Sequence, residues 1–170
     1  MWKARICWCF ILLLTACSDR ADQQLARSGK IDEIAPIKAS AEIVVNAPAA
    51  KVWSILVNIQ SWPSWQHDIT NVSIHAAPAP GIKFDWSSGS GTIHSRIALY
   101  HSQRQFAWTG QLYLFHAIHV WTLTNLPNGQ TLIRTDESMS GWPISVVYSS
   151  TDLLQADQRW LSFLKKRSES

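Results

Sequence analysis

The feature that most constrains this fold is a long run of alternating segments followed by one amphipathic helix. Between residues 69 and 140, apolar and polar side chains alternate in about six stretches, as in strands with one buried face. The clearest alternation places Ile82, Phe84 and Trp86 on one face. Residues 145–166 then predict a long helix with apolar sides. Because this helix has only the sheet to bury against, twisted antiparallel strands are expected to curve around it.

The segment before these strands predicts one more strand and two short helices. Residues 37–45 alternate like a strand, and Asn46 and Pro48 predict the start of a helix. Pro63 breaks that helical pattern, and a short second helical turn is expected near it. The resulting order of strand, short helices, antiparallel strands and long helix is typical of an α+β domain.

The hairpin between the last two predicted strands indicates a specific register. A three-residue loop, Pro127-Asn128-Gly129, pairs Leu126 with Gln130 and keeps the apolar residues of both strands on one face. A two-residue Asn-Gly loop would mix the two faces, so we reject it. The three-residue register places His119 directly opposite Glu137, with Cβ atoms about 5 Å apart.

The predicted His119–Glu137 pair is the candidate polar site, and both residues are the candidate catalytic residues. A carboxylate beside an imidazole favours the charged imidazolium, whereas burial opposes it. Such a pair can bind the polar end of a ligand or perform acid–base chemistry. It can also merely satisfy its own buried polar groups. The sequence leaves all three roles open.

Tryptophan is unusually frequent in this chain. There are ten tryptophans, of which eight lie after the first sixteen residues. Broad rings with one polar atom suit the walls of an apolar pocket, although a tryptophan-rich core without a cavity would also use them. The residues expected to contact a ligand are Trp62, Trp65, Phe84, Trp86, Trp108, His119, Trp121 and Glu137.

Residues 1–16 have the parts of a secretory signal. Lys3 and Arg5 precede the apolar stretch "ICWCFILLL", which is shorter than the roughly 20 residues that span a bilayer. The sequence "LTAC", which ends at Cys17, resembles the lipobox of bacterial lipoproteins. This resemblance implies cleavage before Cys17 and lipidation of Cys17, and Ser18 after it implies the outer membrane, facing the periplasm. The alternative is an ordinary secretory signal with an incidental cysteine.

The lipoprotein interpretation also accounts for the odd number of cysteines. Cys7 and Cys9 would leave with the signal and Cys17 would be acylated, so no disulfide is expected. Residues 17–36 are polar and lack a sustained apolar face, so they are expected to form the lipidated N-terminus and a tether. Residues 37–168 are expected to form a single ligand-binding domain.

Charge and motif content argue against several classes of function. Removal of the signal lowers the number of lysines and arginines from 15 to 13, against 12 acidic residues, so no nucleic-acid surface is expected. His116 and His119 would point to opposite faces of a strand, and no metal site is predicted. The chain shows no glycine-rich phosphate loop and no nucleophile elbow, so no cofactor is expected.

Five motifs follow one another along the predicted domain: "APAAKVWSILVNIQSWPSW" (47–65), "PGIKFDW" (80–86), "FAWTG" (106–110), "HVW" (119–121) and "TDESMSGW" (135–142). In this order they resemble the START/SRPBCC superfamily in its polyketide cyclase/dehydrase-like branch, over residues 37–168. The resemblance implies a helix-grip fold, in which a curved antiparallel sheet wraps a long C-terminal helix and leaves an apolar cavity for a hydrophobic small molecule. It implies no particular reaction, because the superfamily includes carriers, receptors and cyclases.

Three functions fit these observations. The first is a lipid-anchored envelope protein that binds a hydrophobic or amphipathic small molecule as a carrier, sensor or scavenger. The second is a cyclase/dehydrase-like or hydrolase-like enzyme in which His119 and Glu137 act as an acid–base pair. The third is a domain with a collapsed cavity that serves an envelope complex through its surface. The lack of a dense constellation of titratable residues favours the first.

Overall fold

The computed structural model describes residues 19–89 and 91–170. The predicted signal peptide, residues 1–16, and the predicted lipidation site Cys17 lie outside these residues. None of the helices in the described part of the chain is long and apolar enough to cross a membrane.

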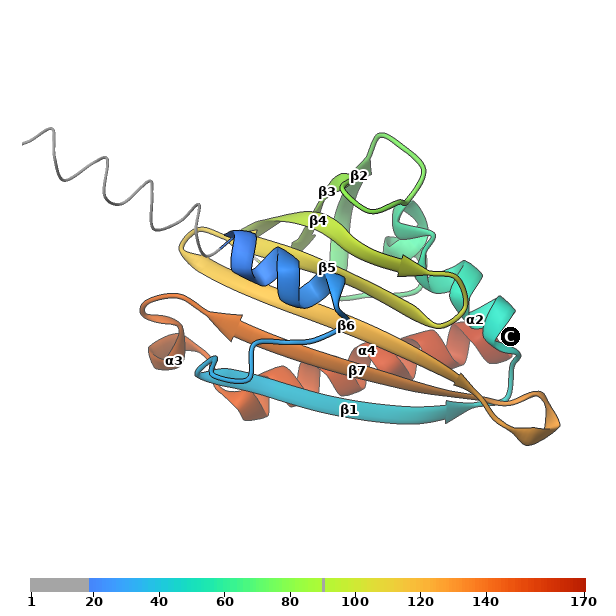
Figure 1. The fold of residues 1–170 in the computed structure, drawn as a ribbon. Helices are drawn as coiled ribbons and strands as arrows, with labels where there is room; N and C mark the ends of the chain where they lie inside the picture. Colours follow the sequence, from blue (N-terminus) through green and yellow to red (C-terminus); the bar gives the residue numbers. More distant parts are fainter. Residues whose placement is uncertain (1–18, 90) are drawn as a thin grey trace, which may run out of the picture.

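Seven antiparallel strands form one curved sheet in the order β1-β7-β6-β5-β4-β3-β2 (Figure 1). The sheet wraps around the long helix α4, so the predicted α+β, helix-grip fold is confirmed. The strands are β1 (Ile37–Val45), β2 (Ile69–Ile74), β3 (Lys83–Ser88), β4 (Gly91–His101), β5 (Gln105–Leu112), β6 (Phe115–Asn125) and β7 (Thr131–Ser140). The helices that follow β1 are α2 (Ala49–Leu56), η1 (Ile59–Ser64), η2 (Pro127–Gly129), α3 (Ile144–Val147) and α4 (Ser150–Glu169).

The C-terminal helix begins later than the sequence predicts. Residues 144–147 form the separate short helix α3, and the backbone is extended at Tyr148 and Ser149. Ser149 then caps α4: its side chain accepts a hydrogen bond from the Asp152 N–H, and the Asp152 carboxylate accepts one from the Ser149 N–H. This capping box starts a new helix, so the predicted single helix over 145–166 is split in two.

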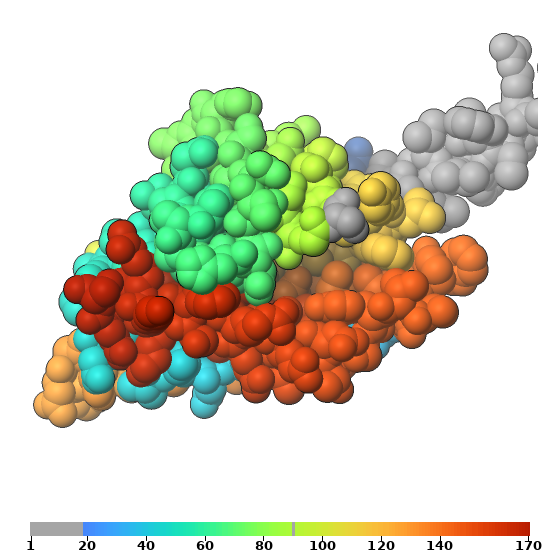
Figure 2. All heavy atoms as spheres, turned by 180° about the vertical axis from the view of Figure 1, so that it is seen from behind, coloured from blue at the N-terminus to red at the C-terminus, as the bar shows by residue number. Residues whose placement is uncertain are grey.

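The main hydrophobic core lies between the sheet and the helices α2, η1 and α4. Figure 2 shows α4 running across this face of the molecule, with the segment that contains η1 and β2 packed beside it. Trp62 and Trp160 meet edge to face at 5.1 Å between ring centroids, and Trp65 also contacts Trp160. The aromatic side chains therefore join η1 to α4 across the open side of the sheet.

The segment expected to be a tether contains a helix over residues 19–27 that packs on the outer face of the sheet (Figure 1). Ala26 is fully buried against a cluster that includes Ala98 and Ala107, and Gln23 donates a hydrogen bond to the Thr109 hydroxyl. Because the contact is made by small side chains, the helix approaches the sheet closely without a strong apolar stripe in its sequence. The sequence analysis missed this contact for that reason.

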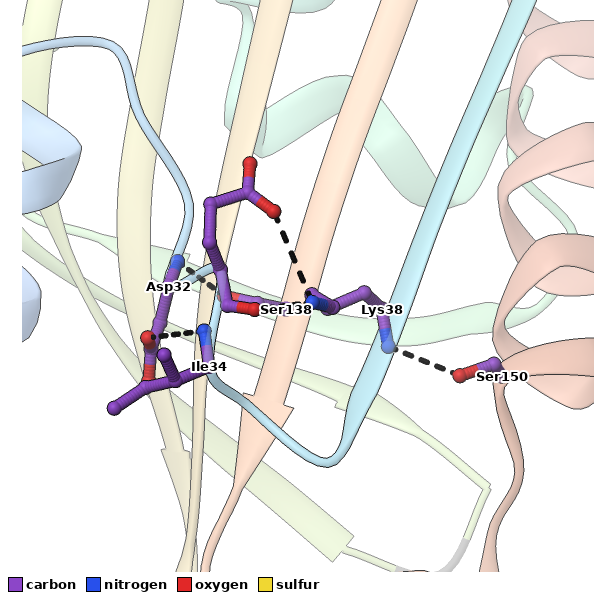
Figure 3. A network of polar contacts seen from close by, with 6 residues as sticks. Asp32, Ile34, Lys38, Ser138 and Ser150 are labelled. Carbon is purple, nitrogen blue, oxygen red and sulfur yellow. Dashed lines mark hydrogen bonds and ion pairs between the residues drawn. The ribbon is translucent and has the colours of Figure 1, made fainter.

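The segment from Asp32 to the start of β1 is also held to the sheet and to α4 (Figure 3). The Asp32 N–H donates to the Ser138 hydroxyl at 3.1 Å, and the Ile34 N–H donates to the Asp32 carboxylate at 3.0 Å. The Lys38 N–H donates to the Ser150 hydroxyl at 3.1 Å. Every residue of the three hydrophobic clusters found in the described part of the chain lies between Leu25 and Leu164. Residues 19–170 therefore include all of these core residues.

Candidate functional site

A cavity of about 310 Å³ lies between the sheet and the helices α3 and α4. Its walls are mostly aliphatic and aromatic, and three of its polar side chains, those of His119, Glu137 and Asp157, lie close to one another. A few polar groups converging in a mainly apolar cavity are the usual composition of a small-molecule site. The lining residues are Trp86, Ser88, Ile93, Leu112, Phe115, His119, Glu137, Met139, Ile144, Val147, Tyr148, Leu153, Ala156, Asp157 and Trp160.

The predicted register that brings His119 and Glu137 together is confirmed. The Leu126 N–H donates to the Gln130 carbonyl at 2.9 Å, which closes the three-residue loop, and His119 is the direct cross-strand partner of Glu137. The loop residues Asn128 and Gly129 both have positive φ angles, of 65° and 75°. Glycine and asparagine adopt this conformation most readily, so the loop sequence fits its backbone.

The polar side of the cavity is a cluster of three side chains from three elements. His119 on β6 and Glu137 on β7 meet at 3.4 Å between Nδ1 and Oε2. Asp157 on α4 places its Oδ1 atom 3.7 Å from His119 Nε2. One donor atom from each residue lies within 4.8 Å of the other two, close enough for the cluster to hold one metal ion.

His119 is enclosed by aromatic rings. Its imidazole stacks on Trp121 at 5.1 Å between ring centroids and lies 4.6 Å from Trp108. Its Nε2 atom is 2.6 Å from the Thr135 hydroxyl, which is also buried. Burial lowers the pKa of His119 to about 3, although the Asp136 carboxylate acts in the opposite direction. The imidazole is therefore neutral at neutral pH, and its contacts with the carboxyl groups are not ion pairs.

The two carboxyl groups favour their protonated forms. Burial and the neighbouring Asp157 raise the pKa of Glu137 well above its ordinary value. Burial also raises the pKa of Asp157, to about 7. Two carboxylates in one buried site repel each other and lose hydration, so neutralisation by protons is the response expected of such a pair. The cluster therefore holds at least one proton near neutral pH.

Asp157 is the site residue that the sequence analysis missed. It is 1% exposed and lies on the same helical face as Leu153, Trp160 and Leu164. Charged residues are rarely fully buried without a partner, so an aspartate inside an apolar stripe indicates a functional position. That pattern was readable in the sequence, but His119 and Glu137 lie on distant strands, and only the fold brings Asp157 beside them.

The eight residues expected to contact a ligand fall into three groups. Trp86, His119 and Glu137 line the cavity, and Trp108 lines an adjoining recess of about 70 Å³. The other four are buried in the packed core instead. Side chains fill the space between the sheet and η1, whereas the cavity lies near α3. These four are Trp62, Trp65, Phe84 and Trp121.

A larger depression of about 470 Å³ lies on the outer face of the sheet, beside residues 19–22. Its walls include Asp22, Lys83, Arg96 and His116. Charged and hydrated walls do not suit an apolar ligand, so this depression is a poorer candidate than the cavity beneath α4.

Comparison with known proteins identifies a family. Residues 36–149 match the family described as "Polyketide cyclase / dehydrase and lipid transport". This range includes β1 to β7 and α3, and therefore His119 and Glu137, but ends just before α4 and Asp157. A search among curated proteins finds no match.

Several solved structures share the fold at low sequence identity. A hypothetical protein from Helicobacter pylori matches with a TM-score of 0.72 and 19% identity, over 80% of this chain and 90% of the other. A START superfamily protein from Mycobacterium smegmatis matches with a TM-score of 0.68 and 18% identity, over 78% and 97% of the two chains. The Zhui aromatase/cyclase from a Streptomyces species matches with a TM-score of 0.62 and 14% identity, over 78% and 93%. At these identities the likeness establishes the fold alone.

Proposed function

The chain belongs to the polyketide cyclase/dehydrase and lipid transport family, and from that premise we propose that it is a lipid-anchored protein of the bacterial cell envelope that binds a hydrophobic or amphipathic small molecule. The lipid is attached at Cys17, and the domain faces the periplasm from the outer membrane. The ligand occupies the cavity between the sheet and α4.

The observation that carries this proposal is the division of the cavity into an apolar part and a polar side. Aliphatic and aromatic side chains from β3 to β7, α3 and α4 enclose the space, while His119, Glu137 and Asp157 converge at one point. Burial of the ligand's apolar portion supplies most of the binding free energy, at about 25 cal/mol per Å². Hydrogen bonds to the polar cluster orient its polar end.

A patch of exposed apolar side chains beside the cavity supports exchange of the ligand with a membrane. These side chains lie on the β5–β6 hairpin and on α3 with the loop before it, next to the lining residues Leu112, Phe115 and Ile144. Exposed apolar residues that gather in one place mark contact surfaces, and aromatic rings suit the bilayer interface. The patch consists of Tyr113, Leu114, Trp142, Val146 and Val147.

The described chain begins at the same end of the molecule as this patch (Figure 1). Asp19 and Asp22 line a depression together with Gln111 and His116, at the end of the β5–β6 hairpin. A lipid on Cys17, two residues before Asp19, would therefore hold the patch close to the bilayer. The anchor and the patch together orient the cavity toward the membrane, where an apolar ligand is most concentrated.

Ligand binding is tested by titrating residues 19–170 with a fluorescent fatty-acid analogue. Ala156→Phe places a ring in the cavity and is expected to lower the affinity at least tenfold, whereas Gln155→Phe, on the exposed side of the same helix, leaves it unchanged. Transfer of fluorescence from Trp86 and Trp160 to the bound probe reports occupancy of the cavity itself. Equal affinities for both variants would exclude the cavity as the binding site.

Catalysis is the second candidate function, and the pKa of Asp157 favours it. A carboxyl group whose pKa is about 7 can donate and accept a proton at neutral pH, as a general acid or base must. His119 and Glu137 would then hold the reacting group of a cyclase/dehydrase-like or hydrolase-like substrate. Loss of turnover in His119→Ala with retained ligand affinity would establish the enzyme, and parallel loss of both would leave the binding function.

A further inference from the structure

We propose that His119, Glu137 and Asp157 form a binding site for one divalent transition-metal ion, and that zinc is the ion their chemistry favours. The site goes beyond the proposed ligand binding and does not depend on it. The metal would lie at the polar side of the cavity, with an open coordination position toward the ligand.

The spacing of the donor atoms carries the proposal. Zinc binds nitrogen and carboxylate oxygen at about 2.0–2.2 Å, which places neighbouring ligands roughly 3–4 Å apart. His119 Nδ1 and Glu137 Oε2, at 3.4 Å, already have this spacing. One donor atom of Asp157 lies within 4.8 Å of a donor atom of each of the other two residues, and its Oδ1 is 3.7 Å from the second ring nitrogen, Nε2. The three donors come from β6, β7 and α4, so the packing of the helix against the sheet sets their geometry.

The surroundings of His119 point to Nδ1 as the ligating nitrogen. Its Nε2 atom lies 2.6 Å from the Thr135 hydroxyl, which can accept a hydrogen bond from Nε2–H. Histidine ligands usually donate their second ring N–H to such a partner, which fixes the tautomer and leaves the other nitrogen free. Nδ1 faces Glu137 Oε2, so the free lone pair points into the cluster.

An unpartnered buried atom is an independent sign of an absent ligand. Asp157 is 1% exposed, and no N–H or hydroxyl group of the described residues donates a hydrogen bond to its buried Oδ2 atom. The Glu137 carboxyl group is the neighbour with which Asp157 can share a proton when no ion is bound. Such an atom is costly unless an ion or a ligand group satisfies it. The cluster also has no lysine or arginine among the cavity residues to balance two carboxylates. One divalent cation would neutralise both carboxylates at once.

The donor set distinguishes between classes of metal. Magnesium and calcium require six or more oxygen ligands, and this cluster offers one nitrogen and two carboxylates. Imidazole with carboxylates suits zinc and its neighbours in the first transition series. Three protein ligands leave a fourth position for water or for a polar ligand group, as in catalytic rather than structural zinc sites. The cavity gives that position access to a ligand.

The test is titration of residues 19–170 with Zn²⁺ against a chromophoric chelator, with Mg²⁺ as the comparison ion. We expect one equivalent of Zn²⁺ to bind to the wild-type domain. Mg²⁺ at the same concentration should not compete. Glu137→Gln and Asp157→Asn, which keep the side-chain shapes, should each lower Zn²⁺ affinity at least tenfold.

The exposed histidine–carboxylate pair of His94 and Asp85 provides a matched control. His94 Nδ1 lies 2.8 Å from Asp85 Oδ1 on the exposed face of β3 and β4. His94→Ala and Asp85→Asn should leave Zn²⁺ affinity unchanged. Thermal unfolding of each variant in the presence of EDTA shows whether the fold is intact, and binding of the fluorescent fatty acid shows whether the cavity is open.

Two outcomes would overturn the proposal. One is the absence of Zn²⁺ binding by a folded wild-type domain. The other is a loss of affinity in the His94 and Asp85 variants with none in the Glu137 and Asp157 variants, which would place the ion on the surface. Either result leaves fatty-acid binding to be judged separately, so failure of the metal site is distinguishable from failure of the proposed function.

Discussion

Two histidine–carboxylate pairs bridge adjacent strands of this sheet. They contain the same functional groups but differ in burial and in the distance between the partners. His94 and Asp85 are direct cross-strand partners 2.8 Å apart, with side chains 69% and 50% exposed. His119 and Glu137 are also direct partners, at 3.4 Å, with side chains 4% and 15% exposed. The shorter contact is therefore the solvated one. The comparison teaches that surroundings, more than the pairing itself, give such a pair its chemical properties.

The buried pair differs because of what the fold adds around it. Trp108 and Trp121 exclude water from the imidazole, and α4 brings a second carboxyl group, that of Asp157. The exposed pair can satisfy its polar atoms with water at little cost. The polar atoms of the buried pair can be satisfied only by protons, an ion or a ligand. For this reason the buried pair is the candidate site.

The largest effect is expected from removing the ring that stacks on the buried imidazole. Trp121 is fully buried and contacts His119 and Trp160. Trp121→Ala should lower the free energy of unfolding by roughly 3–5 kcal/mol, because it leaves a large cavity in the core. Urea denaturation measures this value. A loss below about 1 kcal/mol would show that water already reaches the buried pair.

The next effect concerns the pH dependence of stability. The folded-state pKa of Asp157 is raised to about 7, so its contribution to stability is fully present below its unfolded pKa of 3.8 and is lost as pH rises through 7. The free energy of unfolding of the wild type minus that of Asp157→Asn should therefore fall by roughly 2–4 kcal/mol between pH 4 and pH 8. Denaturation of both proteins in EDTA gives this difference, and a flat difference would contradict the raised pKa.

The contribution of His119 to stability has the opposite pH dependence. Its folded-state pKa is lowered to about 3, so its contribution to stability is present above its unfolded pKa of 6.5 and is lost as pH falls toward 3. Wild type and Asp157→Asn both contain His119, so this contribution largely cancels in their difference. The absolute stability of the wild type alone would combine both effects and would not separate them.

A smaller effect is expected from the hydroxyl that contacts the buried imidazole. Thr135→Val preserves the shape of the side chain and removes the partner of His119 Nε2. The loss in unfolding free energy should be about 1–3 kcal/mol, because a buried polar atom is left without a hydrogen bond. Chemical denaturation at pH 7 tests this, and an unchanged midpoint would show that the hydroxyl does not fix the ring.

The smallest effect is expected at the exposed pair. Asp85→Asn should change the free energy of unfolding by at most about 1 kcal/mol, because water can replace the contact at these exposed side chains. Any electrostatic part of the change should shrink further in 1 M salt, where charges are screened. Denaturation at low and high salt checks both points. A loss as large as that of Thr135→Val would erase the contrast between the two pairs.

The sequence predicted the hairpin better than it predicted the cavity. The register of β6 and β7 follows from parity and turn chemistry, since one face of each strand is apolar and the loop contains Asn128 and Gly129. These are local properties, and they place His119 opposite Glu137. Local information also predicts the amphipathic C-terminal helix, although the extended backbone at Tyr148 divides it.

The lining of the cavity could not be predicted in the same way. Trp62 and Trp86 both face the interior, yet Trp62 is packed among other rings and Trp86 borders the hollow. The difference depends on how η1 and α3 cover the two halves of the sheet, which is a tertiary property. The partnership of Asp157 with His119 has the same origin, because the angle between α4 and the sheet decides it.

Native mass spectrometry of residues 19–170 shows directly whether the space between the sheet and α4 holds a hydrophobic molecule. We expect an added mass in the wild type and in Gln155→Phe that organic extraction removes, and a protein mass alone in Ala156→Phe. A bare protein mass for all three, with no uptake of the fluorescent fatty acid by the wild type, would contradict the proposed ligand binding.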